Sequence, residues 1–135
     1  MPQNNVIASP VVLFIYKRPN HTLKVIEKIN KVNINKVYIV ADGWKNDHDK
    51  HEVMKTRDLI EKINSKVVNI FFTKNIGLRK NCEIGLEKVF SLEEKAIILE
   101  DDTVPDESFF RFCDELLSKY SEFKQISMIA GSNFK

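Results

Sequence analysis

The sequence lacks the features of several large classes of protein. No apolar run approaches the roughly 20 residues that a membrane-spanning helix needs. Met1–Asn5 carries no positive charge and is followed by no long apolar run, so we expect no secretory signal. The 21 basic and 19 acidic residues are interspersed, whereas a nucleic-acid-binding protein would show a basic stripe. We therefore expect one cytoplasmic domain over residues 1–135 with no nucleic-acid partner and no transmembrane segment.

Cysteine is scarce as well. Cys82 and Cys113 are the only two, and both fall in patterns typical of helices, without the spacing of a zinc site. This favours reduced thiols in the core of a cytoplasmic protein over disulfides or metal ligands.

The usual phosphate-binding motifs are also missing. No G-x-x-x-x-G-K-[ST] follows an apolar run, and no G-x-G-x-x-G follows the first one, which argues against P-loop and dinucleotide-binding proteins. A receiver domain or an aspartyl-phosphate phosphatase would carry acids after the first strand, where this chain has "YKRP". The run "DDTVPDES" lacks the central glycine of an EF-hand loop.

Short apolar runs alternate with helical patterns along the whole chain. We expect strands at residues 11–16, 36–41, 67–73, 95–99 and 126–130. Between them we expect a helix that Pro19 and Asn20 open, with Leu23, Ile26 and Ile29 on one face, and helices at about 49–63, 77–90 and 106–120. Asn20 and Asp106 are the expected N-caps of the first and last helices. Strands that alternate with helices form right-handed βαβ units. The expected fold is α/β, a doubly wound, mostly parallel sheet with helices on both faces.

The most unusual stretch is "AIILEDD", in which an apolar strand runs directly into Glu100, Asp101 and Asp102. Three adjacent carboxylates repel one another, so they are either solvated or completed by a cation. Ligands of open α/β sheets bind outside the carboxyl ends of the strands, where these acids and the basic pair Lys17–Arg18 both lie. A diphosphate ligand would suit this edge, because Mg²⁺ or Mn²⁺ could join it to the carboxylates and the basic pair could lie beside it.

Four segments then carry a resemblance: "SPVVLFIYKRPNHTLKVIEKI", "VYIVADG", "NIGLRKNCEIGLEKVF" and "AIILEDDTVPDESFFRFCDELL". In this order they resemble the nucleotide-sugar-binding half of GT-A-fold glycosyltransferases. The closest likeness is to bacterial family 2-type enzymes and to Golgi N-acetylglucosaminyltransferases with an E-D-D form of the DxD motif. The resemblance implies a Rossmann-like nucleotide-diphospho-sugar transferase fold and a metal-dependent glycosyltransferase of the hexosyl or N-acetylhexosaminyl class, with a role in polysaccharide biosynthesis.

The resemblance also implies roles for the acids. Asp102 would be the direct ligand of a divalent metal, Mn²⁺ or Mg²⁺. Asp101 would approach the ribose and the metal, and Glu100 would contact the donor sugar. Asp42 would accept the imino proton of uracil, so the expected donor is a UDP-sugar; from its residues alone, Asp42-Gly43 is a turn signal.

Other positions match the nucleotide side of the donor site. Arg18 corresponds to a basic residue at the end of the first strand, and it could equally pair with a surface acid. Asn75, Gly77 and Arg79 correspond to the loop and helix start beside the donor. Trp44 either lines or caps the donor pocket. The polar segment Asp47–Glu52 is better explained as the solvated start of a helix than as a metal site.

The chain stops at Lys135, where members of the family continue into acceptor-binding elements. We therefore expect a donor-binding part truncated after the fifth strand, with the general base beyond Lys135. The acceptor, whether saccharide, lipid-linked or protein, stays open, as do a homodimer and attachment to the inner membrane face. The alternatives are a non-catalytic sugar-nucleotide-binding or interaction module and, more weakly, a nucleotidyltransferase.

Overall fold

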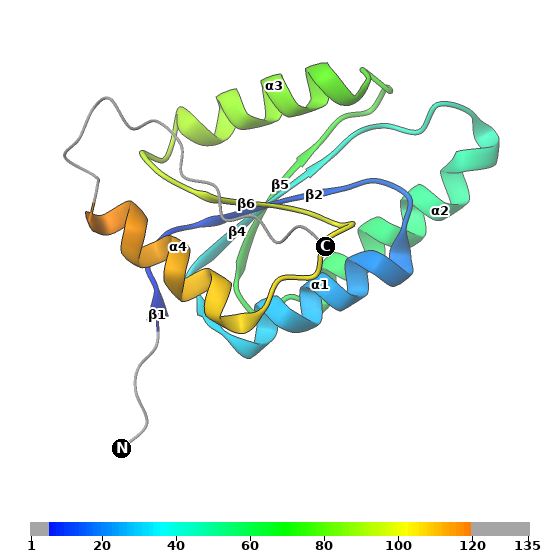
Figure 1. Cartoon of the computed structure of the whole chain (residues 1–135). Coiled ribbons are helices and arrows are strands. Elements are labelled where there is room, and N and C mark those ends of the chain that lie inside the picture. Colours follow the sequence, from blue (N-terminus) through cyan, green and yellow to red (C-terminus); the bar gives the residue numbers. More distant parts are fainter. Residues whose placement is uncertain (1–5, 120–135) are drawn as a thin grey trace.

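A sheet of parallel strands forms the centre of the protein (Figure 1). The structure is a computed structural model and describes residues 6–119. The strands are ordered β5 (Lys66–Phe71), β4 (Lys36–Ala41), β2 (Val11–Ile15) and β6 (Ile97–Glu100), and each pairs in parallel with its neighbour. The four strands expected within the described residues are confirmed, while the one expected at 126–130 lies outside them.

Helices cover both faces of this sheet. α1 (Pro19–Lys31), the 3-10 helix η1 (Leu59–Lys62) and α4 (Glu107–Lys119) contribute to one hydrophobic cluster, and α3 (Leu78–Phe90) contributes to the other. Figure 1 shows α3 above the sheet and α1, α2 (Asp47–Asp58) and α4 below it. The α/β fold with a parallel sheet and helices on both faces is therefore confirmed for the described residues.

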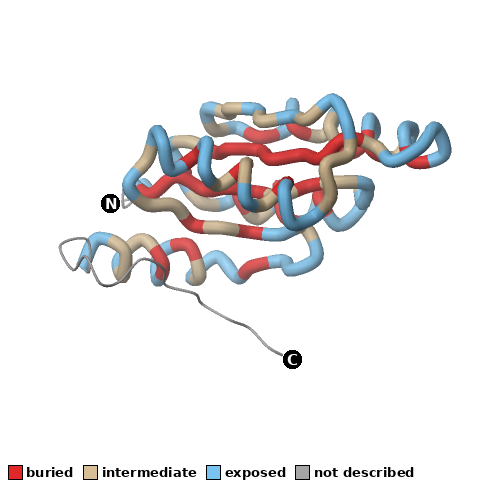
Figure 2. Tube along the Cα trace, turned by 90° about the horizontal axis from the view of Figure 1, so that it is seen from above, coloured by how far each residue is buried: buried red, intermediate tan, exposed pale blue. Residues whose placement is uncertain are grey.

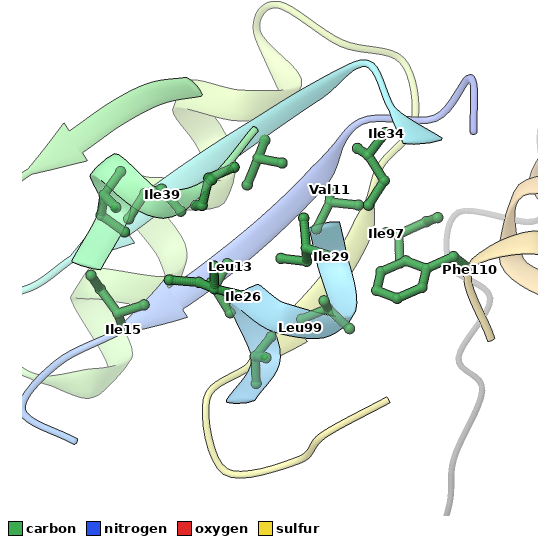
Figure 3. Close-up of a cluster of buried hydrophobic side chains, with 14 of the residues drawn as sticks. Val11, Leu13, Ile15, Ile26, Ile29, Ile34, Ile39, Ile97, Leu99 and Phe110 are labelled. Carbon is green, nitrogen blue, oxygen red and sulfur yellow. The ribbon is translucent and has the colours of Figure 1, made fainter. Parts of the chain in front are cut away.

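Two hydrophobic clusters, one on each face of the sheet, explain why β2 is apolar throughout and why β4 is apolar after Lys36 except for the hydroxyl of Tyr38. Leu13 of β2 lies beside Ile26 of α1, and Phe110 of α4 lies against Ile97 of β6 (Figure 3). Ile39 of β4 and Ile29 of α1 belong to the same cluster. Alternate residues such as Val12 and Val40 face α3 instead. Burial on both faces gives the long red stretches of the central strands in Figure 2.

Some helix limits differ from the expectation. Asn20 is not an N-cap: α1 begins at Pro19, Arg18 holds the cap position, and Asn20 lies inside the first turn. Proline at the first helical position needs no N–H partner and sets φ for a helix, so the cap lies two residues earlier than expected. α2 also starts earlier, at Asp47, because the Asn46 side chain accepts the N–H of Asp49 at 3.0 Å.

The expected cap at Asp106 is confirmed. Its carboxylate accepts the backbone N–H of Ser108 at 3.1 Å and the Ser108 hydroxyl at 2.5 Å, and α4 begins at Glu107. These bonds from Ser108 lower the pKa of the Asp106 carboxyl.

Two large apolar side chains of the helices are exposed, and the sheet arrangement includes two strands that were not expected from the sequence. Leu78 is 76% exposed and Phe112 is 52% exposed, because the helix surfaces that carry them face away from the sheet. The short strands β1 (Val6–Ile7) and β3 (Asn33–Ile34) pair in parallel as a separate small sheet. Two residues are too few to give a periodic pattern in the sequence. Cys82 is half-buried and Cys113 is buried, and both are free thiols.

Candidate functional site

The expected site residues follow strands that end at the same edge of the sheet. β2 lies directly beside β6, with Phe14 opposite Glu100, so the segment Tyr16–Arg18 lies next to the acidic triplet. The sequence placed the acids and the basic pair at the same edge of the sheet, and the register shows that their two strands are neighbours. The ends of β4 and β5 lie on the other side of β2, so four loops meet at one edge.

Asp101 is the half-buried member of the triplet. Burial raises the pKa of its carboxyl, the positive charge of Arg18 lowers that pKa, and the negative charge of Asp102 raises it. His21 and Thr22, in the first turn of α1, also lower the pKa. Asp101 therefore lies against the start of α1 and within the electrostatic reach of Arg18.

The other two acids are exposed. Glu100 ends β6 on the face that carries α3, and its charge contributes to raising the pKa of the half-buried Cys82 thiol, after burial itself. Asp102 accepts a hydrogen bond of 3.3 Å from the Thr103 hydroxyl. The triplet thus offers two exposed carboxylates around one half-buried carboxylate.

Asp42 is 6% exposed, and backbone N–H groups surround its carboxylate. Oδ1 accepts from Gly43 at 2.8 Å and from Ile76 at 2.9 Å, and Oδ2 accepts from Gly77 at 3.1 Å. A carboxylate can accept about four hydrogen bonds, so these three leave it capacity for one more. Asp42 therefore holds the loop between β5 and α3 against the end of β4.

Two neighbouring residues fix the same loop. A Cβ on Gly43 would lie 2.5 Å from the backbone carbon of Lys74, so the two chains approach too closely for a side chain. Asn75 donates from Nδ2 to the Gly43 carbonyl at 2.8 Å and to the Tyr16 hydroxyl at 3.4 Å. The loop that the resemblance assigned to the donor is thus built into the sheet edge.

Arg57 belongs to this edge, and sequence reasoning missed it. From the last turn of α2, its Nη2 donates to the carbonyl of Asp42 at 2.9 Å and to that of Phe72 at 3.1 Å. Its guanidinium carbon lies 4.5 Å from the centroid of the Phe71 ring. Burial lowers the pKa of Arg57, and the negative charge of Asp42 raises it. An arginine in a polar helix gave no signal of this role, because the partners are backbone carbonyls at the ends of β4 and β5.

The start of α2 is mostly exposed, as expected for a solvated helix start, but Asp49 is buried. Asp49 is 7% exposed and forms a 3.0 Å ion pair with Lys17, which lowers the pKa of the Asp49 carboxyl. Lys17 is therefore engaged away from the acidic triplet. Trp44 is half-buried beneath Lys50, whose Nζ lies 5.2 Å from the ring centroid.

The start of α3 is held by its backbone and, within residues 6–119, not by a side-chain cap. Gly77 has a φ of +89°, where a residue with a Cβ is strained, and no side chain caps the helix among the described residues. Arg79 is exposed and pairs with Glu83 at 3.1 Å, along the helix. Its pairing does not bring it toward the acidic triplet.

Residues 6–119 contain no group of three His, Cys, Asp or Glu side chains arranged to hold a metal ion. A magnesium or manganese site can use one or two carboxylates and take its other oxygens from phosphate and water. Asp101 and Asp102 are the pair at this edge that fits such a site. A hollow of about 270 Å³ lies at the opposite edge, lined by Asn30–Ile34, Asn64 and Ser65, and includes none of the expected site residues.

No known family model matches this chain, and no curated protein matches it either. Among residues 6–119, every helix is too short or too polar to cross a membrane.

Proposed function

We propose that this chain binds a nucleotide-diphospho-sugar, with uridine as the base, and that it serves a metal-dependent glycosyltransferase. The observation that carries the proposal is the juxtaposition of Arg18 with Asp101 and Asp102 at the ends of the adjacent strands β2 and β6. A cation beside two carboxylates suits a diphosphate joined to the protein through a divalent ion.

In this proposal Asp102 and Asp101 hold Mn²⁺ or Mg²⁺, and Arg18 lies beside the diphosphate. The bound ion supplies charge neutralisation at the leaving diphosphate. Glu100, exposed on the α3 side of β6, faces the donor sugar. Asp42 reads the uracil with the hydrogen-bonding capacity that its three backbone bonds leave.

The loop after β5 supports this assignment. Asn75 and Gly77 hold the loop against Asp42 and Gly43, so the base would meet a preformed edge. Arg79 is the weakest of the proposed contacts, because it is exposed and already pairs with Glu83.

Thermal unfolding with UDP, in the presence of Mn²⁺ or of a chelator, tests the proposal. Without the ion, the diphosphate and the carboxylates repel, so we expect stabilisation only when the metal is present. Ligand at about 100 times its Kd adds roughly 2.7 kcal/mol to the free energy of unfolding. Asp102→Asn should abolish the shift, and Asp58→Asn, at an exposed acid at the end of α2, should keep it. An equal shift in chelator would contradict the metal bridge.

Base selectivity is tested separately on the unmutated protein. A polar group left unpaired by the wrong base costs about 1–3 kcal/mol, so UDP should bind at least several-fold more tightly than CDP. Equal affinity for the two nucleotides would remove the role of Asp42 as base reader and leave the metal-dependent diphosphate site intact.

A further inference from the structure

Asn81 is a buried amide whose carbonyl oxygen has no partner. The residue lies in the first turns of α3 and is 5% exposed. Its Oδ1 accepts no hydrogen bond in the described part of the chain. Buried polar atoms of native proteins are nearly always paired, and an unpaired one costs about 1–3 kcal/mol. An unpaired acceptor here calls for a donor that the protein chain does not supply.

The position of Asn81 follows from the packing of α3 on the sheet (Figure 1). Asn81, Gly85 and Val89 are the buried residues of this helix and recur every fourth position, so they share the face that meets the sheet. A Cβ on Gly85 would lie 2.6 Å from Cγ1 of Val40, which places Gly85 directly on β4. α3 returns from the carboxyl end of β5 toward the start of β6, so it runs opposite to the strands.

Asn81 therefore lies one helical turn closer to the candidate site than Gly85 does. One turn advances about 5.4 Å, which equals nearly two residues of a strand. Two residues beyond Val40 is Asp42, the last residue of the β4 edge described above. The next residue of α3, Cys82, is affected by the charge of Glu100 at the end of β6. Asn81 thus lies toward the end of β4, next to a residue that is affected by the charge of Glu100.

We propose that Asn81 is a ligand-binding residue whose Oδ1 accepts a hydrogen bond from a hydroxyl group of the nucleotide-sugar. This inference rests on the proposed function, because it assigns a further contact within the same site. A neutral acceptor suits this position, since a carboxylate would add to the repulsion between Glu100, Asp101, Asp102 and a diphosphate. The hydroxyl comes either from the ribose, which joins the base to the diphosphate, or from the transferred sugar, which is attached to the other end of the diphosphate.

Because Oδ1 is unpaired, Asn81→Ala should weaken ligand binding without lowering the stability of the ligand-free protein. The ligand-free variant loses no hydrogen bond of Oδ1, and alanine favours a helix more than asparagine does. Its melting temperature should therefore equal or exceed that of the unmutated protein. Binding should weaken roughly 2- to 10-fold, the effect of losing one neutral hydrogen bond.

Ser9→Ala is the matched control. Ser9 is fully buried, its Oγ also lacks a partner among the described residues, and it precedes β2 at the opposite edge of the sheet. Removing this oxygen should leave nucleotide binding unchanged. Any general effect of deleting a buried oxygen would appear in this variant as well.

The experiment is calorimetric titration of the three proteins with UDP and with UDP-glucose, each with Mn²⁺. Weakened binding of both ligands by Asn81→Ala assigns the hydroxyl to the ribose, and weakened binding of UDP-glucose alone assigns it to the sugar. Unchanged binding of both ligands would overturn the inference about Asn81 and leave the proposed function standing.

Two other results would also overturn it. A ligand-free melting temperature several degrees below that of the unmutated protein would mean that Oδ1 is paired within the folded protein. No binding of either ligand by the unmutated protein would overturn the proposed function, and the role of Asn81 with it.

Discussion

The carboxylate of Asp42, after β4, accepts the backbone N–H of Gly77, at the start of α3, across 3.1 Å. The two residues are 35 positions apart in the sequence. Gly77 adopts a φ of +89°, so the chain turns sharply there while Asp42 holds its N–H. A residue expected to recognise a base thus also maintains the shape of the edge at which the base would bind.

Asp42→Ala should destabilise the protein even without ligand. The N–H groups of Ile76 and Gly77 lose their acceptor, which costs about 1–3 kcal/mol. Asp42→Asn keeps one acceptor oxygen and should lose less. Urea denaturation of the three proteins measures the difference. An Asp42→Ala variant as stable as the unmutated protein would show that the loop does not depend on this carboxylate.

Gly43→Ala should destabilise the protein more than Gly85→Ala does. The new Cβ at position 43 would meet the backbone of Lys74 at 2.5 Å, and overpacking of this kind typically costs about 1–3 kcal/mol. At position 85 the new Cβ meets the Val40 side chain rather than backbone, and alanine gains about 1 kcal/mol in a helix, which offsets part of the clash. Thermal unfolding compares the two variants, and the reverse order would contradict the close approach of Gly43 to the β5–α3 loop.

Asp101→Asn should abolish metal-dependent binding of UDP without lowering the stability of the ligand-free protein. Burial raises the pKa of Asp101, so its contribution to stability is greatest at low pH and falls as the pH rises through the folded pKa. At neutral pH the ionised carboxylate is therefore less favourable than a neutral amide. We expect a ligand-free melting temperature that is unchanged or higher, together with loss of the Mn²⁺-dependent shift by UDP. A variant that keeps the shift would remove Asp101 from the metal site.

The Glu93 carboxylate should give the protein a pH-dependent stability. It accepts hydrogen bonds from the Tyr38 hydroxyl at 2.6 Å and from Lys36 Nζ at 2.9 Å, and these two bonds lower its pKa. A lowered pKa gives stability that is present above the unfolded pKa of about 4.3 and is lost as the pH falls through the folded pKa.

Glu93→Gln removes this titration. The variant should be less stable than the unmutated protein at pH 7, and the difference should shrink at acidic pH. Glu94→Gln, at the exposed neighbouring position, is the control. Denaturation curves between pH 7 and acidic pH measure both variants; a gap that stays constant across this range would contradict the role of the Glu93 carboxylate.

The sequence was sufficient to predict those features that depend on local patterns. The continuous apolar runs of β2 and β4 predict strands buried on both faces, and their alternation with helices predicts a parallel sheet. The acidic triplet and Arg18 could be placed together, because the carboxyl ends of parallel strands share one edge. The cap at Asp106 followed from its side chain and its position before a helix.

Features that depend on distant backbone groups could not be predicted. The partners of Asp42 lie 34 and 35 residues away, and only the pairing of β4 with β5 brings them close. Arg57 donates to carbonyls, and every residue of the chain carries one of these, so no residue type indicated its role. Asp49 resembled a solvated acid because its pairing with Lys17 spans 32 residues.

The most direct measurement of the central proposal is the paramagnetic effect of Mn²⁺ on backbone amide resonances in the presence of UDP. Mn²⁺ broadens resonances of nuclei close to it, so it reports the position of the ion in the fold. We expect selective broadening of the amide resonances of Asp101–Thr103 and Arg18–His21. The resonances around the hollow at Asn30–Ile34, on the opposite edge, should broaden little. Broadening centred on Asp47–Glu52, or equal broadening with and without UDP, would contradict a metal-bridged diphosphate at the ends of β2 and β6.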